Sequence, residues 1–236
     1  MYSGRHQRLT MTNAHPAAQS PPAESTASSN RRSEAAVAGH RLDEASARGH
    51  LLDPAGSVRA TALNALARSK RLMAKDLVRG LSDPDPTVRR RSCEIAAREA
   101  RTGRLPEIQD VCAMIVDLLE DPDELVCEAA AWALGEIGER ADVLASDALS
   151  VIAAVATGHR SALCREAAVA ALGALGDPSA IPSVLAALHD QPSVRRRAVV
   201  ALAPFEHPDV LAALQDCLND RDWQVRESAR ELLATP

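Results

Sequence analysis

The chain has 236 residues, of which 46% are hydrophobic and 25% charged, so it can bury a large core or a long stack of helices. Its formal net charge of -5 argues against general nucleic-acid binding, for which a basic surface is expected. Only 2% of the residues are aromatic, and the abundant Ala, Leu and Val residues favour close helix-on-helix packing over a single bulky core.

The first part of the chain has the composition of a disordered tail. Residues 1–33 are rich in Ser, Thr, Pro, Ala and Asn and show no apolar periodicity, so they cannot bury enough surface to offset the entropy of ordering the chain. We expect this tail to end at residue 33 and a helical domain to occupy residues 34–236. Met11 lies within the tail and is an alternative start of the chain.

One short motif recurs along the rest of the chain. The copy at residues 83–89 reads Asp-Pro-Asp-Pro-Thr-Val-Arg, and Val88 serves as the marker position of the repeat. The counterparts of Val88 are Val58, Val126, Cys164, Val194 and Val225, so the markers follow one another at steps of 30, 38, 38, 30 and 31 residues. A period of this length predicts two-helix units that stack into a solenoid.

Each copy of the motif ends one helix and begins the next. Asp-Pro stops a helix, because proline lacks an amide donor and disfavours helix in the residue before it. A second Asp, such as Asp85, can cap the following helix, and an apolar stripe at helical spacing follows each marker. The six predicted helix pairs are 34–51 with 57–68, 70–81 with 86–101, 106–120 with 124–137, 142–157 with 162–175, 179–189 with 193–203, and 208–218 with 223–234.

Two segments within these units carry a resemblance to a known repeat family. Residues 132–138, Trp-Ala-Leu-Gly-Glu-Ile-Gly, and residues 171–178, Ala-Leu-Gly-Ala-Leu-Gly-Asp-Pro, resemble the HEAT-like repeats of the phycobilisome-lyase (PBS lyase) type. The resemblance covers about residues 35–236 and implies an all-α fold, a right-handed α-α superhelix of about six two-helix repeats. It leaves the function open, because such proteins include scaffolds, bilin lyases, a lysine hydroxylase and relatives of DNA glycosylases.

The resemblance also implies a structural ladder of ion pairs between the turn Asp and the Arg after the marker of neighbouring units. The expected acids are Asp53, Asp83, Asp121, Asp190 and Asp220, and the expected arginines are Arg59, Arg89, Arg165, Arg195 and Arg226. The third unit has Cys127 in place of the arginine, and the fourth has His159 or Arg160 near the missing Asp. We therefore expect the ladder to be interrupted in the middle of the array.

Helical phase separates the core from a candidate binding surface. Positions two, six and nine after each marker point away from the apolar stripe, and they form a binding surface if the second helices line the concave side, as in solenoids generally. The candidate partner-binding residues are Trp132, Glu128, Arg90, Glu94, Glu166, Arg196 and Val200. Trp132 is the candidate anchor, with packing between units as the alternative, whereas Trp223 is expected to close the C-terminal end of the core.

No constellation of residues points to catalysis, a cofactor or a metal. The seven histidines are scattered and none is followed by Glu, so the His-Glu pairs of the di-iron deoxyhypusine hydroxylase relatives are absent. The five cysteines lie far apart with no Cys-x-x-Cys pair, which favours buried thiols in a reducing compartment over disulfides or a zinc cluster. For a bilin lyase, Cys127 is the best candidate thiol, because its side chain leaves the apolar stripe.

These observations predict a non-catalytic scaffold or adaptor that binds a protein or peptide partner through the concave face. Two alternatives stay open: a bilin-lyase-like or chaperone-like subunit, and a nucleic-acid-binding HEAT-like protein related to DNA glycosylases. No apolar run reaches the roughly 18 residues of a membrane span, and the first residues lack the apolar segment of a secretory signal. We expect a cytoplasmic protein and leave its oligomeric state open.

Overall fold

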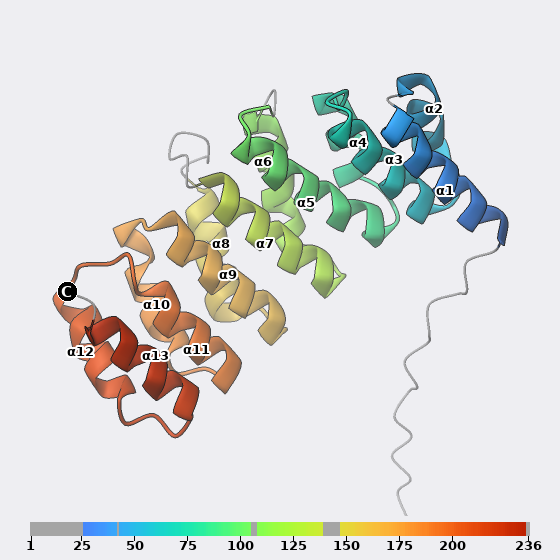
Figure 1. Cartoon of the computed structure of the whole chain (residues 1–236). Coiled ribbons are helices and arrows are strands. Elements are labelled where there is room, and N and C mark those ends of the chain that lie inside the picture. The colour runs from blue at the N-terminus through green and yellow to red at the C-terminus, as the bar shows by residue number, and fades with distance from the viewer. Residues whose placement is uncertain (1–25, 42, 105–107, 139–146, 235–236) are drawn as a thin grey trace, which may run out of the picture.

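The chain folds into helices that follow one another along an arc (Figure 1). The computed structural model describes residues 26–41, 43–104, 108–138 and 147–234, and within these residues all regular secondary structure is helical. The α-helices are α1 (Thr26–Arg41), α2 (Glu44–Gly49), α3 (Gly56–Arg68), α4 (Ala74–Leu81), α5 (Pro86–Arg101), α6 (Ile108–Asp117), α7 (Glu124–Gly138), α8 (Ala148–Gly158), α9 (Ala162–Leu175), α10 (Ile181–Ala187), α11 (Pro192–Ala201), α12 (Pro208–Cys217) and α13 (Trp223–Ala234). Three short 3-10 helices extend this set: η1 (His50–Leu52), η2 (Leu118–Glu120) and η3 (Pro178–Ala180). The all-α repeat superhelix predicted from the sequence is confirmed.

The turn signals act where the sequence places them. Asp85 caps α5, because its Oδ1 accepts the N–H of Thr87 at 2.9 Å, and Pro86 occupies the first helical position. Gly176 ends α9 in the left-handed conformation with φ 63°, which glycine adopts without a steric cost. The helix boundaries therefore follow from local chemistry in most units.

The second helices of the units form one continuous row. Helices α3, α5, α7, α9, α11 and α13 each pack on the next, and the first helices α4, α6, α8, α10 and α12 form a second row (Figure 1). The apolar stripe of each second helix lies between the two rows: in α7, Val126, Ala130, Leu134 and Ile137 are all 0% exposed. None of the described helices is both long and apolar enough to cross a membrane.

The ordered array begins earlier than the sequence suggested. Helix α1 starts at Thr26, inside the tail expected over residues 1–33, and it packs on α3 as α3 packs on α5. The helix expected over residues 34–51 is divided, because Asp43 starts a new helix by accepting the N–H of Ser46 at 3.1 Å. Helix α1 is thus one more second helix at the head of the row, while Met11 and the rest of residues 1–25 lie outside the described residues.

Candidate binding surface and the interrupted ladder

The arginine that follows four of the six markers joins two successive units. Arg59 donates from Nε to Oδ2 of Asp83 in the next unit at 2.8 Å, and from Nη1 to the main-chain carbonyl of Asp53 in its own turn at 2.7 Å. The carboxylate of Asp83 also accepts the N–H of Asp85 at 2.9 Å. Each pair therefore ties a helix start, a turn and the neighbouring turn together.

The ion pair between arginine and aspartate recurs at four other joints. The pairs and their shortest separations are Arg31–Asp53 at 2.6 Å, Arg89–Asp121 at 2.7 Å, Arg165–Asp190 at 2.6 Å and Arg195–Asp220 at 2.9 Å. Hydrogen bonds from the arginines hold the pKa values of Asp53, Asp190 and Asp220 below their ordinary value. The ladder implied by the resemblance is thus present in the structure wherever both members of a pair exist.

The two ends of the ladder differ from the expected set. Arg31 was assigned to the tail, yet it supplies the arginine that bonds Asp53. The repeat motif could not be recognised there because a polar residue, Asn30, occupies the marker position before Arg31. Arg226 bonds the carbonyl of Asp220 in its own turn at 2.7 Å and pairs with no acid among the described residues.

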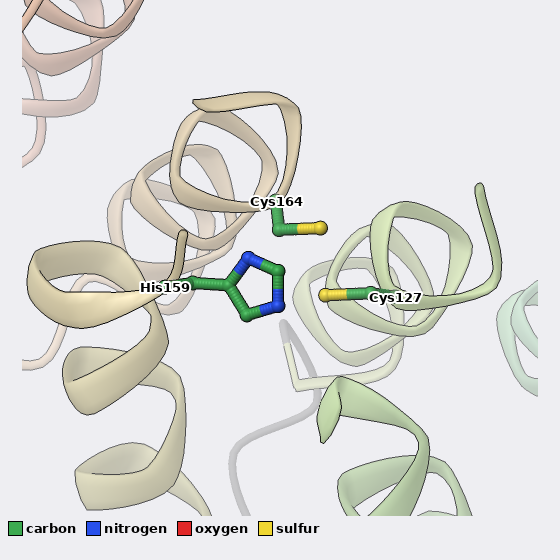
Figure 2. A group of neighbouring side chains, drawn as sticks. All are labelled: Cys127, His159 and Cys164. Atoms are coloured by element: carbon green, nitrogen blue, oxygen red, sulfur yellow. The ribbon is translucent and has the colours of Figure 1, made fainter. Parts of the chain in front are cut away.

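The ladder is interrupted between the third and fourth units, as the sequence predicted. Sγ of Cys127 donates to the carbonyl of Leu119 at 3.0 Å, and His159 stands where the next unit should supply an aspartate. Nδ1 of His159 accepts the N–H of Ser161 at 3.1 Å, so the ring takes over the turn-forming role of the carboxylate but not its charge. Figure 2 shows that the thiol of Cys164 lies beside this histidine and Cys127, which makes these three residues the candidate metal ligands.

The candidate binding surface is the face of the second-helix row, and a groove in this face lies between α7 and α9. A groove of about 300 Å³ is lined there by residues that include Glu128, Trp132, Glu166, Ala170 and Arg197. The side chain of Trp132 is 43% exposed, so it does not pack away between units. Three of the seven predicted partner-binding residues, Glu128, Trp132 and Glu166, therefore meet in one groove.

The other four predicted contacts lie on neighbouring helices. Arg90 and Glu94 are 3.6 Å apart on α5, and Glu94 also pairs with Arg91. Arg196 on α11 pairs with Asp222 at 3.5 Å and also bonds Gln224. Val200 on α11 is 50% exposed and free to contact a partner.

Two expectations about side-chain direction are wrong. Position nine after the marker is covered by the neighbouring second helix in three copies, where Ala67, Ala97 and Gly135 are buried, whereas Ala203 and Ala234 are exposed. Gly173 is half-buried, and a Cβ built on it would lie 2.7 Å from Cα of Ala201. The reason is that each second helix inside the row is flanked on both sides by another. Trp223 is 66% exposed and does not close the core, because it stands at the first position of α13, ahead of the apolar stripe.

The five thiols are buried. Burial raises the pKa of Cys93 to about 12 and that of Cys112 to about 11, and burial followed by the neighbouring Cys164 raises the pKa of Cys127. The expectation that Cys127 leaves the core is wrong, because η2 and the start of α9 cover it and its exposure is 0%. None of these three thiols is available as an exposed nucleophile.

Fold and surface together define an α-solenoid of stacked two-helix repeats with a row of second helices open on one face. The sequence model for HEAT repeats matches residues 74–156 and 149–234, and the chain belongs to the HEAT repeat family. None of the curated proteins compared with it gives a significant match.

Solved structures share the fold at low sequence identity. The Escherichia coli protein YibA is 15% identical with a TM-score of 0.59, covering 91% of this chain and 77% of its own. A designed armadillo repeat protein in complex with the peptide (KR)4 is 18% identical with a TM-score of 0.54, covering 86% and 97%. The complex of CpcE and CpcF, the phycocyanin lyase of Nostoc sp. PCC7120, is 23% identical with a TM-score of 0.54, covering 80% and 75%.

Proposed function

We propose that the protein is a non-catalytic adaptor that binds an extended peptide segment of a partner protein across the groove between α7 and α9. The observation that carries this proposal is the exposed indole of Trp132 in a groove with acidic walls. Tryptophan at the centre of a concave surface is a frequent anchor of protein interfaces. The second-helix face that holds it corresponds to the side that we predicted from the sequence to be concave.

The charges of the groove favour a basic residue in the partner. Glu128 forms no ion pair within the part of the chain that the structure describes, and Glu166 has only the 3.5 Å contact with Arg197. A lysine or arginine side chain could lie over the indole and reach Glu128, which combines a cation–π contact with an ion pair. The designed armadillo relative that binds the peptide (KR)4 supports this choice by showing a repeat solenoid with a basic peptide.

The alternative functions receive less support from the site. A bilin lyase of the phycobilisome-lyase type needs an accessible group, whereas Cys127 is fully buried, and the likeness to CpcE and CpcF extends to the fold alone. A nucleic-acid binder needs a basic surface, whereas the groove has three acids against one arginine, Arg197. We therefore propose a protein partner and no chemical step.

The test is selection of binding peptides from a random library displayed on phage, followed by affinity measurement on synthetic peptides. We expect the selected peptides to contain Lys or Arg next to an apolar residue, and Trp132→Ala and Glu128→Lys to weaken their binding by at least about tenfold, the order expected for a hot-spot residue. Trp223→Ala is the matched control, since this tryptophan is exposed outside the groove. Equal binding by wild type and Trp132→Ala would contradict the proposal.

A further inference from the structure

The interruption of the ladder consists of two substitutions that complement each other chemically. The arginine of each unit bonds the aspartate of the next, so Cys127 of the third unit lies opposite His159 of the fourth. A third change accompanies them, because Cys164 occupies a marker position that is Val in the other five copies. Two metal-ligating side chains replace the members of one ion pair, and a third lies beside them.

The three side chains are close enough to share one ion. Figure 2 shows the imidazole of His159 facing the two sulfur atoms, with a ring nitrogen turned toward Cys127. One ligand atom from each residue lies within 4.8 Å of the other two. Tetrahedral zinc, with Zn–S of about 2.3 Å and Zn–N of about 2.0 Å, needs ligand atoms about 3.5–3.8 Å apart. Small side-chain rotations close this difference, and no other such trio occurs among the described residues.

We propose that Cys127, His159 and Cys164 bind one Zn²⁺ ion that joins the third and fourth units where the arginine–aspartate pair is missing. Two thiolates balance the charge of the ion, and thiolate with imidazole selects zinc over magnesium and calcium, which prefer oxygen ligands. The fourth ligand is a water molecule. A cavity of about 590 Å³ has His159 in its wall and gives water and ions a route to the edge of the cluster.

Zinc binding exchanges protons and hydrogen bonds. Each thiol releases its proton to solvent and binds as thiolate. This gives up the bond from Sγ of Cys127 to the carbonyl of Leu119 at 3.0 Å and the bond from Sγ of Cys164 to the carbonyl of Glu124 at 3.7 Å. Nδ1 of His159 now accepts the N–H of Ser161, so the neutral ring carries its proton on Nε2. Ligation through Nε2 moves that proton to Nδ1 and gives up the bond from Ser161, whereas ligation through Nδ1 replaces that bond directly. In both cases one hydrogen bond of 3.1 Å is exchanged for a metal–nitrogen bond.

The experiment titrates the full chain, reduced with a phosphine, with Zn²⁺ by calorimetry and with Co²⁺ by absorption. We expect one ion per chain, thiolate-to-cobalt charge transfer in the near ultraviolet and the intense visible bands of tetrahedral cobalt. Cys127→Ser and His159→Ala should each weaken binding by more than about 100-fold, because loss of an outer-shell partner alone typically costs 10–100-fold. Cys112→Ala, which removes a buried thiol outside the cluster, should bind zinc as wild type does.

The double variant Cys127→Arg/His159→Asp is the matched control for folding. It rebuilds the pair that the other joints have, so it should remain helical by circular dichroism, bind no zinc, and melt at a temperature that zinc does not change. The wild-type melting temperature should rise with zinc. The proposal is overturned by a lack of stoichiometric binding to the reduced wild type, by a native disulfide between Cys127 and Cys164, or by undiminished binding to the double variant.

Discussion

Arg195 reaches Asp220 from a side chain that is only 5% exposed, and it also bonds the carbonyl of Asp190 at 2.8 Å. Exposed ion pairs contribute about 0–1 kcal/mol to stability. A partner lost from a mostly buried charge costs more, because the remaining charge stays desolvated. At the scale of single residues, the ladder arginines are therefore held by several bonds each, and the acids that receive them are the sensitive members.

Asp220→Asn should lower stability by about 1.5–3 kcal/mol at neutral pH, the range for a hydrogen bond to a charged group. Since the bond from Arg195 lowers the folded-state pKa of Asp220 below the ordinary 3.8, this stabilisation is present above that value and is lost as pH falls through the lowered pKa. Urea midpoints of wild type and variant should thus differ above about pH 4 and converge in stronger acid. The control is Asp216→Asn, which changes an exposed acid without an ion pair among the described residues. A difference in urea midpoint between Asp220→Asn and wild type that stays constant down to the lowest pH would contradict this account.

The sequence predicted the paired residues of the ladder but not the trio beside its gap. Asp83 and Arg59 could be matched because both recur at the repeat spacing. Cys127 and His159 both stood out in the sequence as departures from the repeat motif. Their proximity, however, depends on the arginine position of one unit lying against the aspartate position of the next, and the repeat spacing alone does not give this arrangement. Arg31 was missed because the residue before it is polar.

At the scale of helices, the second-helix row depends on small residues where two backbones approach. A Cβ on Gly173 of α9 would meet Cα and Cβ of Ala201 in α11, both at 2.7 Å. Real Cβ atoms do not come so close to backbone atoms, so α9 and α11 would have to move apart. The close approach explains why a glycine is used here in spite of its low helix propensity.

Gly173→Ala should therefore destabilise the protein by about 1–3 kcal/mol, the usual cost of overpacking, although alanine favours helix by about 1 kcal/mol. Gly158→Ala is the matched control, because nothing lies within 4 Å of its added Cβ. Denaturant unfolding of both variants checks the prediction. It fails if Gly173→Ala is as stable as Gly158→Ala.

Most helices were predictable, because turn signals and apolar stripes agree. Asp85 and Pro86 begin α5 in the structure as in the sequence. The exception is the start of the array, where α1 lacks both a Pro turn and a strong apolar stripe. Its Ala35 and Ala38 are buried against α3 only because α3 presents a matching surface, which composition does not reveal.

At the scale of the whole molecule, stability comes from each unit packing on its neighbours. Leu134 is 0% exposed in α7. Leu134→Ala should therefore lower the free energy of unfolding by about 2–5 kcal/mol. Amide hydrogen exchange should then accelerate in α5 and α9 as well as in α7, because both pack on α7. The control is Leu211→Ala, at a position 52% exposed, which should change stability by less than about 0.5 kcal/mol. If Leu134→Ala accelerates exchange in α7 alone, nearest-neighbour coupling is contradicted.

The overall architecture followed from the repeat period, whereas the binding surface followed only in part. Trp132 could be placed outside the stripe by helical phase, and its groove required the position of the next helix, with Glu166 opposite. Helical phase also placed Gly173 on the surface, but this residue is half-buried because Ala201 of α11 lies close to it. Helical phase gives the direction of a side chain from its own helix, whereas its exposure also depends on the neighbouring helices of the array.

The gap in the ladder also has a mechanical meaning. Five ladder pairs of arginine and aspartate join successive units in the described part of the chain, and the joint between the third and fourth units has no such pair. At this joint the packing of α7 on α9, and no ladder ion pair, resists bending of the array. The groove of Trp132 lies between α7 and α9, across the same joint, so elastic bending there widens or narrows the groove, and stiffening the joint fixes its width.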